Sequence, residues 1–363
     1  MNLEALYDLA DEVRESYIPT PDEDVPYVGL EHVSQQTLQL LGRGSSLEVE
    51  SNKYKFKKGD ILFGTLRPYF RKIIIAPFDG VCSTEYSVIR PKDSSKANFV
   101  FYFLANEKFI EYATTNSVGA RPRTKWKLFS DYKIRKTTDQ EKTDIGIKLR
   151  CLDDLIENNR RRIQLLEESA RLLYQEWFVH LRFPGHEQVK IIDGVPEGWE
   201  KKPLKEIATL NYGKALKAEV RIPGPFPVYG SSGEVGSHEK PLVKGPGIVI
   251  GRKGNVGSVY WVNTDFYPID TVYFISAEES SLFLYHALQN IQFINTDVAV
   301  PGLNRNMAYS REILVPDDKN FHRFLSEVVP IQEQINKLQD YSNKLAQARD
   351  LLLPKLMSGE LTV

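Results

Sequence analysis

Cysteine is scarce in this chain. Its two cysteines, Cys82 and Cys151, lie far apart and lack metal-ligand spacing, so neither a disulfide scaffold nor a cysteine-based zinc site is expected. The sequence also has no apolar run of about 18 residues, the length that a membrane-spanning helix needs. Its acidic, amphipathic start is unlike a signal peptide. We therefore expect a protein of a reduced, cytoplasmic compartment that has no membrane partner.

A strong net charge is also absent. The 47 Lys and Arg residues almost balance the 48 Asp and Glu residues, which leaves a net charge of −1. Any surface that binds a polyanion must therefore arise from local clustering of basic residues. The hydrophobic content of 42% and the aromatic content of 11% are sufficient for sizeable cores, and 363 residues suggest two or three domains.

Motifs of catalytic sites are missing as well. There is no phosphate-binding GxxxxGK[ST] sequence, and GRKGNVG (251–257) has neither Rossmann nor kinase spacing, which favours a tight hairpin turn. The histidines are scattered. PDDK (316–319) has no metal-binding acid on a preceding strand, and the Asn/Asp-Pro-Pro-aromatic motif of amino-methyltransferases does not occur. We expect a non-enzyme with no catalytic residue and no metal ligand.

Proline is absent from residues 139–183, where the only glycine is Gly146. Apolar residues recur there at alternating steps of four and three, which is typical of a coiled-coil seam. One helix over this stretch would be about 60 Å long. The predicted seam contains Ile145, Leu149, Leu152, Ile156, Asn159, Ile163, Leu166 and Leu173.

Such a seam requires a partner helix, and residues 330–356 repeat its spacing through Leu338, Leu345 and Leu352. Ser342 and Arg349 interrupt this second ladder. Any heptad segment could be an oligomerisation helix, but two in one chain favour an intramolecular antiparallel pair. The polar Asn159 would fix the register of the pair, or it would lie at a solvent-open point; we prefer the first interpretation.

Two β-rich blocks flank the first helix and repeat each other. KKGDILFGTLR (57–67) corresponds to KGPGIVIGRKG (244–254), and GVCSTEYSVIRP (80–91) corresponds to FYPIDTVYFIS (266–276). LYDLA (6–10) likewise matches LKEIA (204–208). We predict an α+β protein with a pseudo-twofold internal repeat. Its expected segments are 1–138, 139–183 (long helix), 184–316 (linker and second block) and 317–363 (second long helix).

Each block offers loops in which basic residues alternate with aromatic residues, asparagine and glycine, including SVGARPRTKW (117–126) and AVPGLNRNMAY (299–309). Arg and Lys suit guanine edges and phosphates, and Asn suits adenine. Each residue alone could equally be a solvated loop charge, but their repeat-equivalent positions favour a tandem DNA reader. The candidate DNA contacts are Arg67, Tyr69, Arg71, Arg121, Arg123, Lys125, Lys214, Lys217, Arg252, Lys253, Asn255, Asn304 and Arg305.

Over essentially its full length the chain resembles the specificity (S) subunit of type I restriction–modification enzymes. The resemblance rests on LDDLIENNRRRIQLLEESARLLYQEWF (152–178), RDLLLPKLMSGEL (349–361), VPEGWEKKPLKEIA (195–208) and GRKGNVGSVYW (251–261) with YPIDTVYF (267–274). It implies two target recognition domains, each reading half of an asymmetric bipartite site in double-stranded DNA. The helices would be the conserved spacer that docks two methyltransferase (M) subunits.

The resemblance also implies that this chain has no cofactor. S-adenosylmethionine, ATP and Mg would bind to the methyltransferase and restriction (R) subunits. Two other function classes remain open on the residues alone: an unrecognised nuclease or the reading part of a fused enzyme, and a coiled-coil scaffold whose paired β modules bind protein or glycan. DNA contacts are expected above all from Arg67, Arg121, Arg123, Lys253, Asn255 and Arg305.

Overall fold

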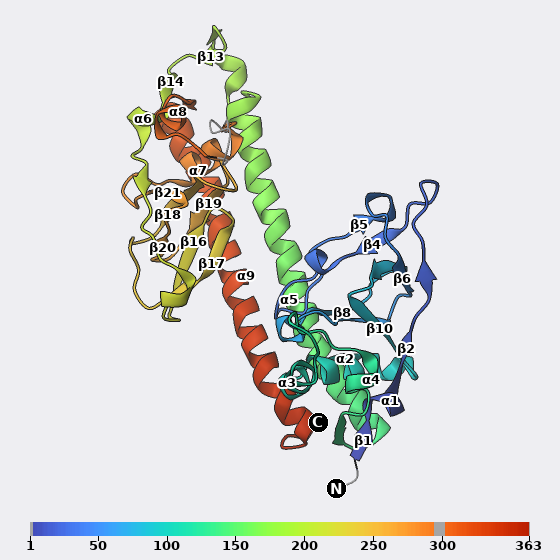
Figure 1. Ribbon diagram of the computed structural model, residues 1–363. Helices are drawn as coiled ribbons and strands as arrows, with labels where there is room; N and C mark the ends of the chain where they lie inside the picture. Colours follow the sequence, from blue (N-terminus) through green and yellow to red (C-terminus); the bar gives the residue numbers. More distant parts are fainter. Residues whose placement is uncertain (1–2, 294–301, 363) are drawn as a thin grey trace. The chain divides into compact units, whose positions relative to one another are not determined.

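The computed structural model describes residues 3–293 and 302–362, which form two compact units. Unit 1 comprises Met1–Arg160 and Asp340–Val363, and unit 2 comprises Arg161–Gln339. Two long helices, α5 (Asp139–Tyr174) and α9 (Asp318–Ser358), contribute residues to both units (Figure 1). None of the described helices is long and apolar enough to cross a membrane.

Unit 1 is built around a four-stranded antiparallel sheet with the order β2-β10-β7-β8. Its strands are β2 (Ala10–Val13), β7 (Ile61–Gly64), β8 (Ile73–Ile75) and β10 (Tyr86–Pro91). A second sheet has the order β3-β6-β9-β4-β5, with β4 and β9 parallel. Its strands are β3 (Ser16–Tyr17), β4 (Pro26–Val28), β5 (Gly44–Ser45), β6 (Lys53–Phe56) and β9 (Gly80–Ser83).

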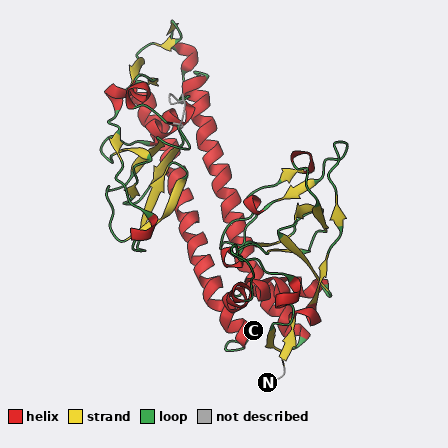
Figure 2. Ribbon diagram, viewed as in Figure 1, coloured by secondary structure: helices red, strands yellow, loops and turns green. Residues whose placement is uncertain are grey.

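The helices of unit 1 cover one face of the four-stranded sheet, and the second sheet packs on its other face (Figure 2). Ile61 and Phe63 belong to the core beneath the helices, whereas Leu62 between them belongs to the core between the sheets. This alternation follows from the two-residue period of a strand. The helices of this unit are α1 (Leu6–Leu9), α2 (Ala97–Ala105), α3 (Glu107–Thr115) and α4 (Trp126–Phe129).

Unit 2 has the same architecture. Its four-stranded sheet has the order β15-β21-β18-β19, and Ile248 and Ile250 face the helices whereas Val249 faces the second sheet. The second sheet has the order β17-β16-β20, with β16 and β20 parallel. The strands are β15 (Asn211–Tyr212), β16 (Phe226–Gly230), β17 (Gly233–His238), β18 (Gly247–Gly251), β19 (Val259–Val262), β20 (Tyr267–Pro268) and β21 (Val272–Ile275). The helices are α6 (Leu204–Ile207), α7 (Leu282–Asn290) and α8 (Arg305–Tyr309).

The predicted internal repeat is confirmed in the four-stranded sheets, whereas the second sheet has five strands in unit 1 and three in unit 2. The matched segments around 57–67 and 244–254 form β7 and β18, and the next matched pair forms β9–β10 and β20–β21. Each unit also has a strand pair beside its long helices: β1 (Leu3–Ala5) with β11 (Lys133–Arg135), and β14 (Glu200–Pro203) with β22 (Glu312–Val315). A small hairpin of β12 (Ile191–Ile192) and β13 (Val195–Pro196) precedes β14. Residues 299–301 of the predicted loop lie outside the described residues.

The two long helices pack as an antiparallel pair in each unit. In unit 1 the Asp153 carboxylate contacts Arg349, and in unit 2 Tyr174 and Trp177 contact Phe324. All predicted seam residues are buried or half-buried. Ile145, Leu149, Ile156 and Leu338 are buried, and the half-buried ones are Leu152, Asn159, Ile163, Leu166, Leu173, Leu345 and Leu352. The role of Asn159 in register stays a prediction.

Two details of the helices differ from the predictions. The first helix ends at Tyr174, and a π-helical turn over Gln175–Val179 follows, so the helical segment stops before Phe183. Leu181, with φ 58°, has left the helical conformation. Arg349 does not interrupt the packing of α9, because it is only 2% exposed and lies against Asp153.

A buried ion pair attaches the first strand to α5. The Lys142 ammonium lies 2.8 Å from the Glu4 carboxylate, and their side chains are 5% and 7% exposed. We predict that Lys142→Met lowers the free energy of unfolding by about 3 kcal/mol, because it leaves the Glu4 charge buried without its partner. Arg150→Met is the control, since the Arg150–Asp154 pair on the same helix is exposed, and it should cost less than about 1 kcal/mol. Urea unfolding of both variants measures the difference; equal losses would contradict the prediction.

Candidate nucleic-acid interface

In both units two loops meet beyond the end of one inner strand of the four-stranded sheet, which is β7 in unit 1 and β18 in unit 2. In unit 2 the loop after β18 (252–258) pairs with residues 302–306, through a bridge between Lys253 and Gly302. In unit 1 the loop after β7 (65–72) pairs with residues 117–124, through a bridge between Leu66 and Arg123. Because the same loops meet at the same place in both copies of the fold, we call them the reading loops of each unit.

The first reading loop of unit 2 is a hairpin connection, as predicted for GRKGNVG, but it spans residues 252–258 and is longer than a tight turn. It joins the antiparallel strands β18 and β19, and the amide N–H of Gly251 donates to the Ser258 carbonyl at 2.8 Å. A Cβ on Gly251 would lie 2.1 Å from the Asn255 carbonyl oxygen, and Gly257 has φ +78°. The glycines therefore close the turn, and Lys253 and Asn255 between them are exposed.

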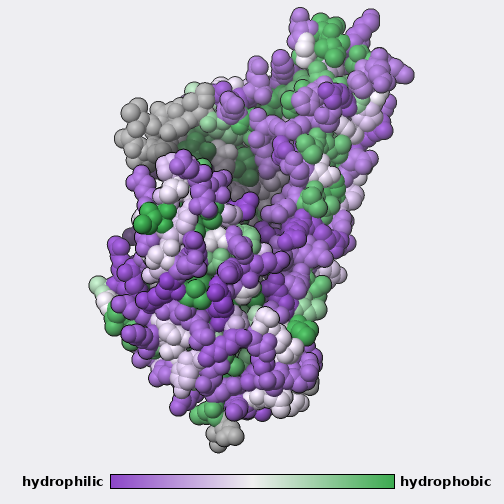
Figure 3. Space-filling view, turned by 90° about the vertical axis from the view of Figure 1, so that its right-hand side faces the viewer, coloured by the Kyte–Doolittle hydropathy of each residue, from purple (hydrophilic) through white to green (hydrophobic). Residues whose placement is uncertain are grey.

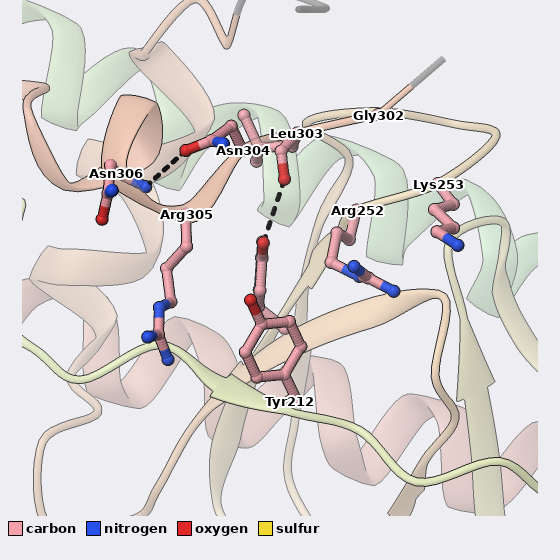
Figure 4. A pocket seen from close by; sticks show the side chains of 9 residues that line it. Tyr212, Arg252, Lys253, Gly302, Leu303, Asn304, Arg305 and Asn306 are labelled. Atoms are coloured by element: carbon pink, nitrogen blue, oxygen red, sulfur yellow. Dashed lines mark hydrogen bonds between the residues drawn. The ribbon is translucent and has the colours of Figure 1, made fainter. Parts of the chain in front are cut away.

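The reading loops of unit 2 enclose a cavity of about 270 Å³ (Figure 4). Four predicted residues line it, namely Arg252, Lys253, Asn304 and Arg305. Tyr212 of β15 lies between the two arginines, whose guanidinium carbons are 5.2 Å (Arg252) and 5.1 Å (Arg305) from its ring centroid. No acidic residue occurs among the described residues that line the cavity. The cavity is therefore positively charged and has an aromatic floor.

Hydrogen bonds hold the second reading loop of unit 2 in place. The Tyr273 hydroxyl donates to the Leu303 carbonyl at 3.0 Å, and the Leu303 amide donates to the Arg252 carbonyl at 2.8 Å. Burial raises the pKa of Tyr273 to about 12, which keeps its hydroxyl a neutral donor. The Asn304 side chain accepts from the amide of Asn306 at 2.8 Å and so caps α8. The loop is thus preorganised before any ligand arrives.

The reading loops of unit 1 are joined by backbone hydrogen bonds. The Arg67 amide donates to the Pro122 carbonyl at 2.7 Å, and the Thr124 amide donates to the Thr65 carbonyl at 3.0 Å. Arg67 and Arg121, from different loops, are both exposed. The Arg67 guanidinium carbon lies 5.8 Å from the Phe70 ring centroid. This junction brings together basic side chains that are separated by more than fifty residues in the sequence.

Three further predicted residues of unit 1 surround this junction. Arg123 is half exposed, and its guanidinium lies 2.5 Å from the Glu85 carboxylate. Tyr69 is 41% exposed and packs edge-on against Phe70. Lys125 is exposed where α4 begins. These side chains give unit 1 a surface that differs from the cavity of unit 2 in shape and composition.

Some predicted residues lie apart from these surfaces. In unit 2, Lys214, Lys217 and Asn255 are exposed but do not line the cavity. In unit 1 the Arg71 side chain is only 13% exposed and turns toward Asp350 of α9. DNA contact by any of the thirteen predicted residues stays a prediction.

Sequence reasoning missed Tyr212 and Tyr273, the two aromatic residues of the cavity. Tyr212 lies two positions before Lys214. The only feature of the sequence that could have pointed to it is that its segment follows the repeated LKEIA. Its position beneath the arginines depends on the pairing of β15 with β21, which the sequence pattern does not reveal. Among the described residues no group of three or more His, Cys, Asp or Glu is arranged to hold a metal ion.

Known proteins resemble this chain in sequence and in fold. It is 25% identical to the type I restriction enzyme MjaIX specificity subunit of Methanocaldococcus jannaschii, over 94% of this chain and 87% of that protein. It is 24% identical to the HindI specificity subunit of Haemophilus influenzae, over 85% and 88% of the two chains. The crystal structure of a type I restriction–modification S subunit from M. genitalium shares the fold, with a TM-score of 0.57, 17% identity and coverage of 98% and 96%.

The match to a family model covers most of the chain and reflects its repeat. The model, described as the type I restriction modification DNA specificity domain, matches residues 16–168 and again residues 196–345. The first match contains strands β7, β8 and β10 of the unit 1 sheet, and the second contains all four strands of the unit 2 sheet. The reading loops of each unit lie within its match. Together with the repeated fold and its loops, these matches show that the chain belongs to the family of type I restriction–modification specificity subunits.

Proposed function

We propose that this specificity subunit reads double-stranded DNA through its reading loops, one half-site for each unit. One observation carries the proposal: two copies of one fold present basic and aromatic side chains at the same place on loops with different sequences. A loop at the end of a rigid sheet can hold a few side chains against base edges. Contacts with phosphates then fix the orientation of the protein on the duplex.

The side chains support two unlike half-sites. In unit 2, Arg305 and Lys253 suit guanine or phosphate, and Tyr212 provides an aromatic surface between two guanidinium groups. The oxygen of Asn304 already accepts hydrogen bonds from α8, so its amide N–H groups remain to donate. Unit 1 instead offers Arg67 and Arg121, which are exposed where its two reading loops join. The proposed target is therefore asymmetric.

The long helices would set the spacing of the half-sites and dock methyltransferase subunits. Leu165, Leu172 and Val179 recur at heptad spacing on α5 and its π-helical end, and they are 71%, 46% and 53% exposed. Exposed apolar residues that follow one helix face mark a protein-binding surface. On the face that Figure 3 shows, hydrophobic residues form separate patches among mainly hydrophilic ones.

Catalysis is assigned to other chains in this proposal. S-adenosylmethionine, ATP and Mg would bind to methyltransferase and restriction subunits, and this subunit would only direct them to their DNA site. The basic and aromatic character of the reading loops supports this division, because these residues suit recognition of bases and phosphates.

We predict that Arg305→Ala weakens discrimination at one half-site by about 1–3 kcal/mol, because the proposed role of Arg305 is a charged contact with a base edge at the unit 2 cavity. Arg323→Ala is the matched control, since Arg323 is exposed on α9 away from that cavity. The assembled complex first selects its target from a randomised duplex library, and titration with duplexes altered in either half then measures discrimination.

Two results would contradict this prediction. Equal losses for Arg305→Ala and Arg323→Ala would indicate a nonspecific charge effect, and a wild-type complex that selects no sequence would refute DNA reading itself. As a further check, affinity for the selected duplex should fall steeply as salt concentration rises.

We predict that Leu172→Glu reduces co-purification of methyltransferase subunits at least about tenfold, because a carboxylate would be buried within an apolar contact. Ile192→Glu is the control: Ile192 is 61% exposed but belongs to the hairpin of β12 and β13. Affinity capture of tagged variants co-expressed with the methyltransferase measures the ratio of methyltransferase to specificity subunit. Unchanged recovery with Leu172→Glu would exclude this helix face as the docking surface.

A further inference from the structure

The first reading loop of unit 1 contains two residues in an unusual backbone conformation. Arg67 and Arg71 both have φ 51°, and they flank a short 3-10 turn over Pro68–Phe70. A left-handed conformation is unfavourable for a residue other than glycine. The conformation persists only where the surroundings of the residue hold it in place.

Unit 2 has a glycine at the corresponding left-handed position of its first reading loop. The loop of unit 1 closes with a hydrogen bond of 2.8 Å from the Gly64 amide to the Lys72 carbonyl, as the Gly251 amide bonds to Ser258 in unit 2. Arg71 therefore corresponds to Gly257, which has φ +78°. Because glycine would meet the backbone requirement at lower cost, the arginine at this position has another role.

The Arg71 side chain points toward the long helix α9 rather than toward solvent. Its guanidinium Nη2 lies 3.7 Å from the Asp350 carboxylate, and the side chain is only 13% exposed. Burial lowers the pKa of Arg71, and the Asp350 carboxylate opposes this effect. The contact joins a reading loop to a helix that is distant in sequence.

Asp350 itself belongs to a larger ionic network. Its carboxylate lies 3.0 Å from Arg349, which also contacts Asp153 of α5 at 2.6 Å. The Tyr102 hydroxyl of α2 donates to the same Asp153 carboxylate. Burial acts to lower the pKa of Arg349, but the two carboxylates outweigh it and raise the pKa. The network thus fixes Asp350 relative to α2, α5 and α9.

The second repeat lacks this network. ARLLYQEWF (170–178) corresponds to RDLLLPKLM (349–357), so Ala170 stands where Arg349 does and Arg171 stands where Asp350 does. Arg171 pairs with Glu168 on its own helix. An arginine in the reading loop and an acidic partner on the long helix therefore occur together in unit 1, and both are replaced in unit 2.

The side of the loop that faces α9 is not fully packed. It borders a cavity of about 550 Å³ whose lining includes Tyr69, Arg71, Glu107 and Asp350. The 3-10 turn between Arg67 and Arg71 carries Tyr69, which is 41% exposed. Within the turn, the Tyr69 and Phe70 carbonyls accept hydrogen bonds from the side chain and the amide of Gln36. The end of the turn that faces α9 is held through Arg71.

We infer that Arg71 is a positioning residue that fastens the first reading loop of unit 1 to Asp350 of α9, so that Arg67 and Tyr69 are held in the orientation that reads DNA. The inference rests on the proposed DNA-reading function and assigns Arg71 a role other than base contact. It makes accurate reading of one half-site depend on a residue of the long helix that lies outside the reading loops.

Two variants of the full chain, assembled with its methyltransferase subunits, test the inference. Asp350→Asn removes the charge from a half-exposed carboxylate, and Arg71→Gly removes the side chain while keeping a residue suited to positive φ. Asp340→Asn, an exposed position on the same helix, is the matched control. The probe is the duplex that the wild-type complex selects from a randomised library, with versions altered in each half. The half-site that Arg305→Ala affects is assigned to unit 2, and the other to unit 1.

Both variants should lower discrimination at the unit 1 half-site about tenfold and leave discrimination at the unit 2 half-site and the melting temperature unchanged. The control Asp340→Asn should leave discrimination at both half-sites unchanged. Wild-type discrimination in Arg71→Gly and Asp350→Asn would overturn the inference. Equal losses at both half-sites, or a lower melting temperature that accounts for the loss, would also overturn it by showing a general structural role. If the wild-type complex selects no sequence, DNA reading fails, and the inference fails with it.

Discussion

The apolar stripe on each long helix is the constraint on which the rest of the structure depends. Neither α5 nor α9 could leave such a stripe in water, and each buries parts of it in the cores of both units. The cores of the β-rich parts then continue from this pair: Ile145 and Leu149 belong to the core of unit 1, and Tyr174 and Trp177 belong to the core of unit 2. The long helices therefore contribute to the cores of both units and also connect their β-rich parts along the sequence.

On this base the protein repeats one sheet topology and varies its loops. The strand order and the alternation of buried residues are the same in β7 and β18, whereas the turn after β18 is closed by glycine and the turn after β7 contains Arg71. Residues that determine the sheet face two cores and tolerate little change. The loop residues face solvent and can differ, which is how one scaffold can present two different surfaces.

Much of this architecture could be predicted from local sequence patterns. The heptad spacing of Ile145, Leu149 and Ile156 and the echo of ILFG (61–64) in IVIG (248–251) are patterns within short segments. The basic residues of the unit 2 cavity could be predicted from their type and repeat position. Tyr212 could not, because strand pairing places it there, and Arg71 was assigned to DNA because only the tertiary contact with Asp350 reveals its direction. The interior position of Arg349 likewise depends on Asp153, a residue remote in sequence.

The composition of unit 1 has a consequence for how the chain folds during synthesis. Its core contains Leu353, Leu356 and Met357 together with Leu6 and Leu9, so the amino-terminal β-rich part cannot complete its packing when it leaves the ribosome. Unit 2, which is continuous from Arg161 to Gln339, has all its residues available earlier. The part of the chain that is synthesised first therefore completes its packing last. Until then its apolar surface stays exposed, because the contacts that cover it are long-range and form slowly.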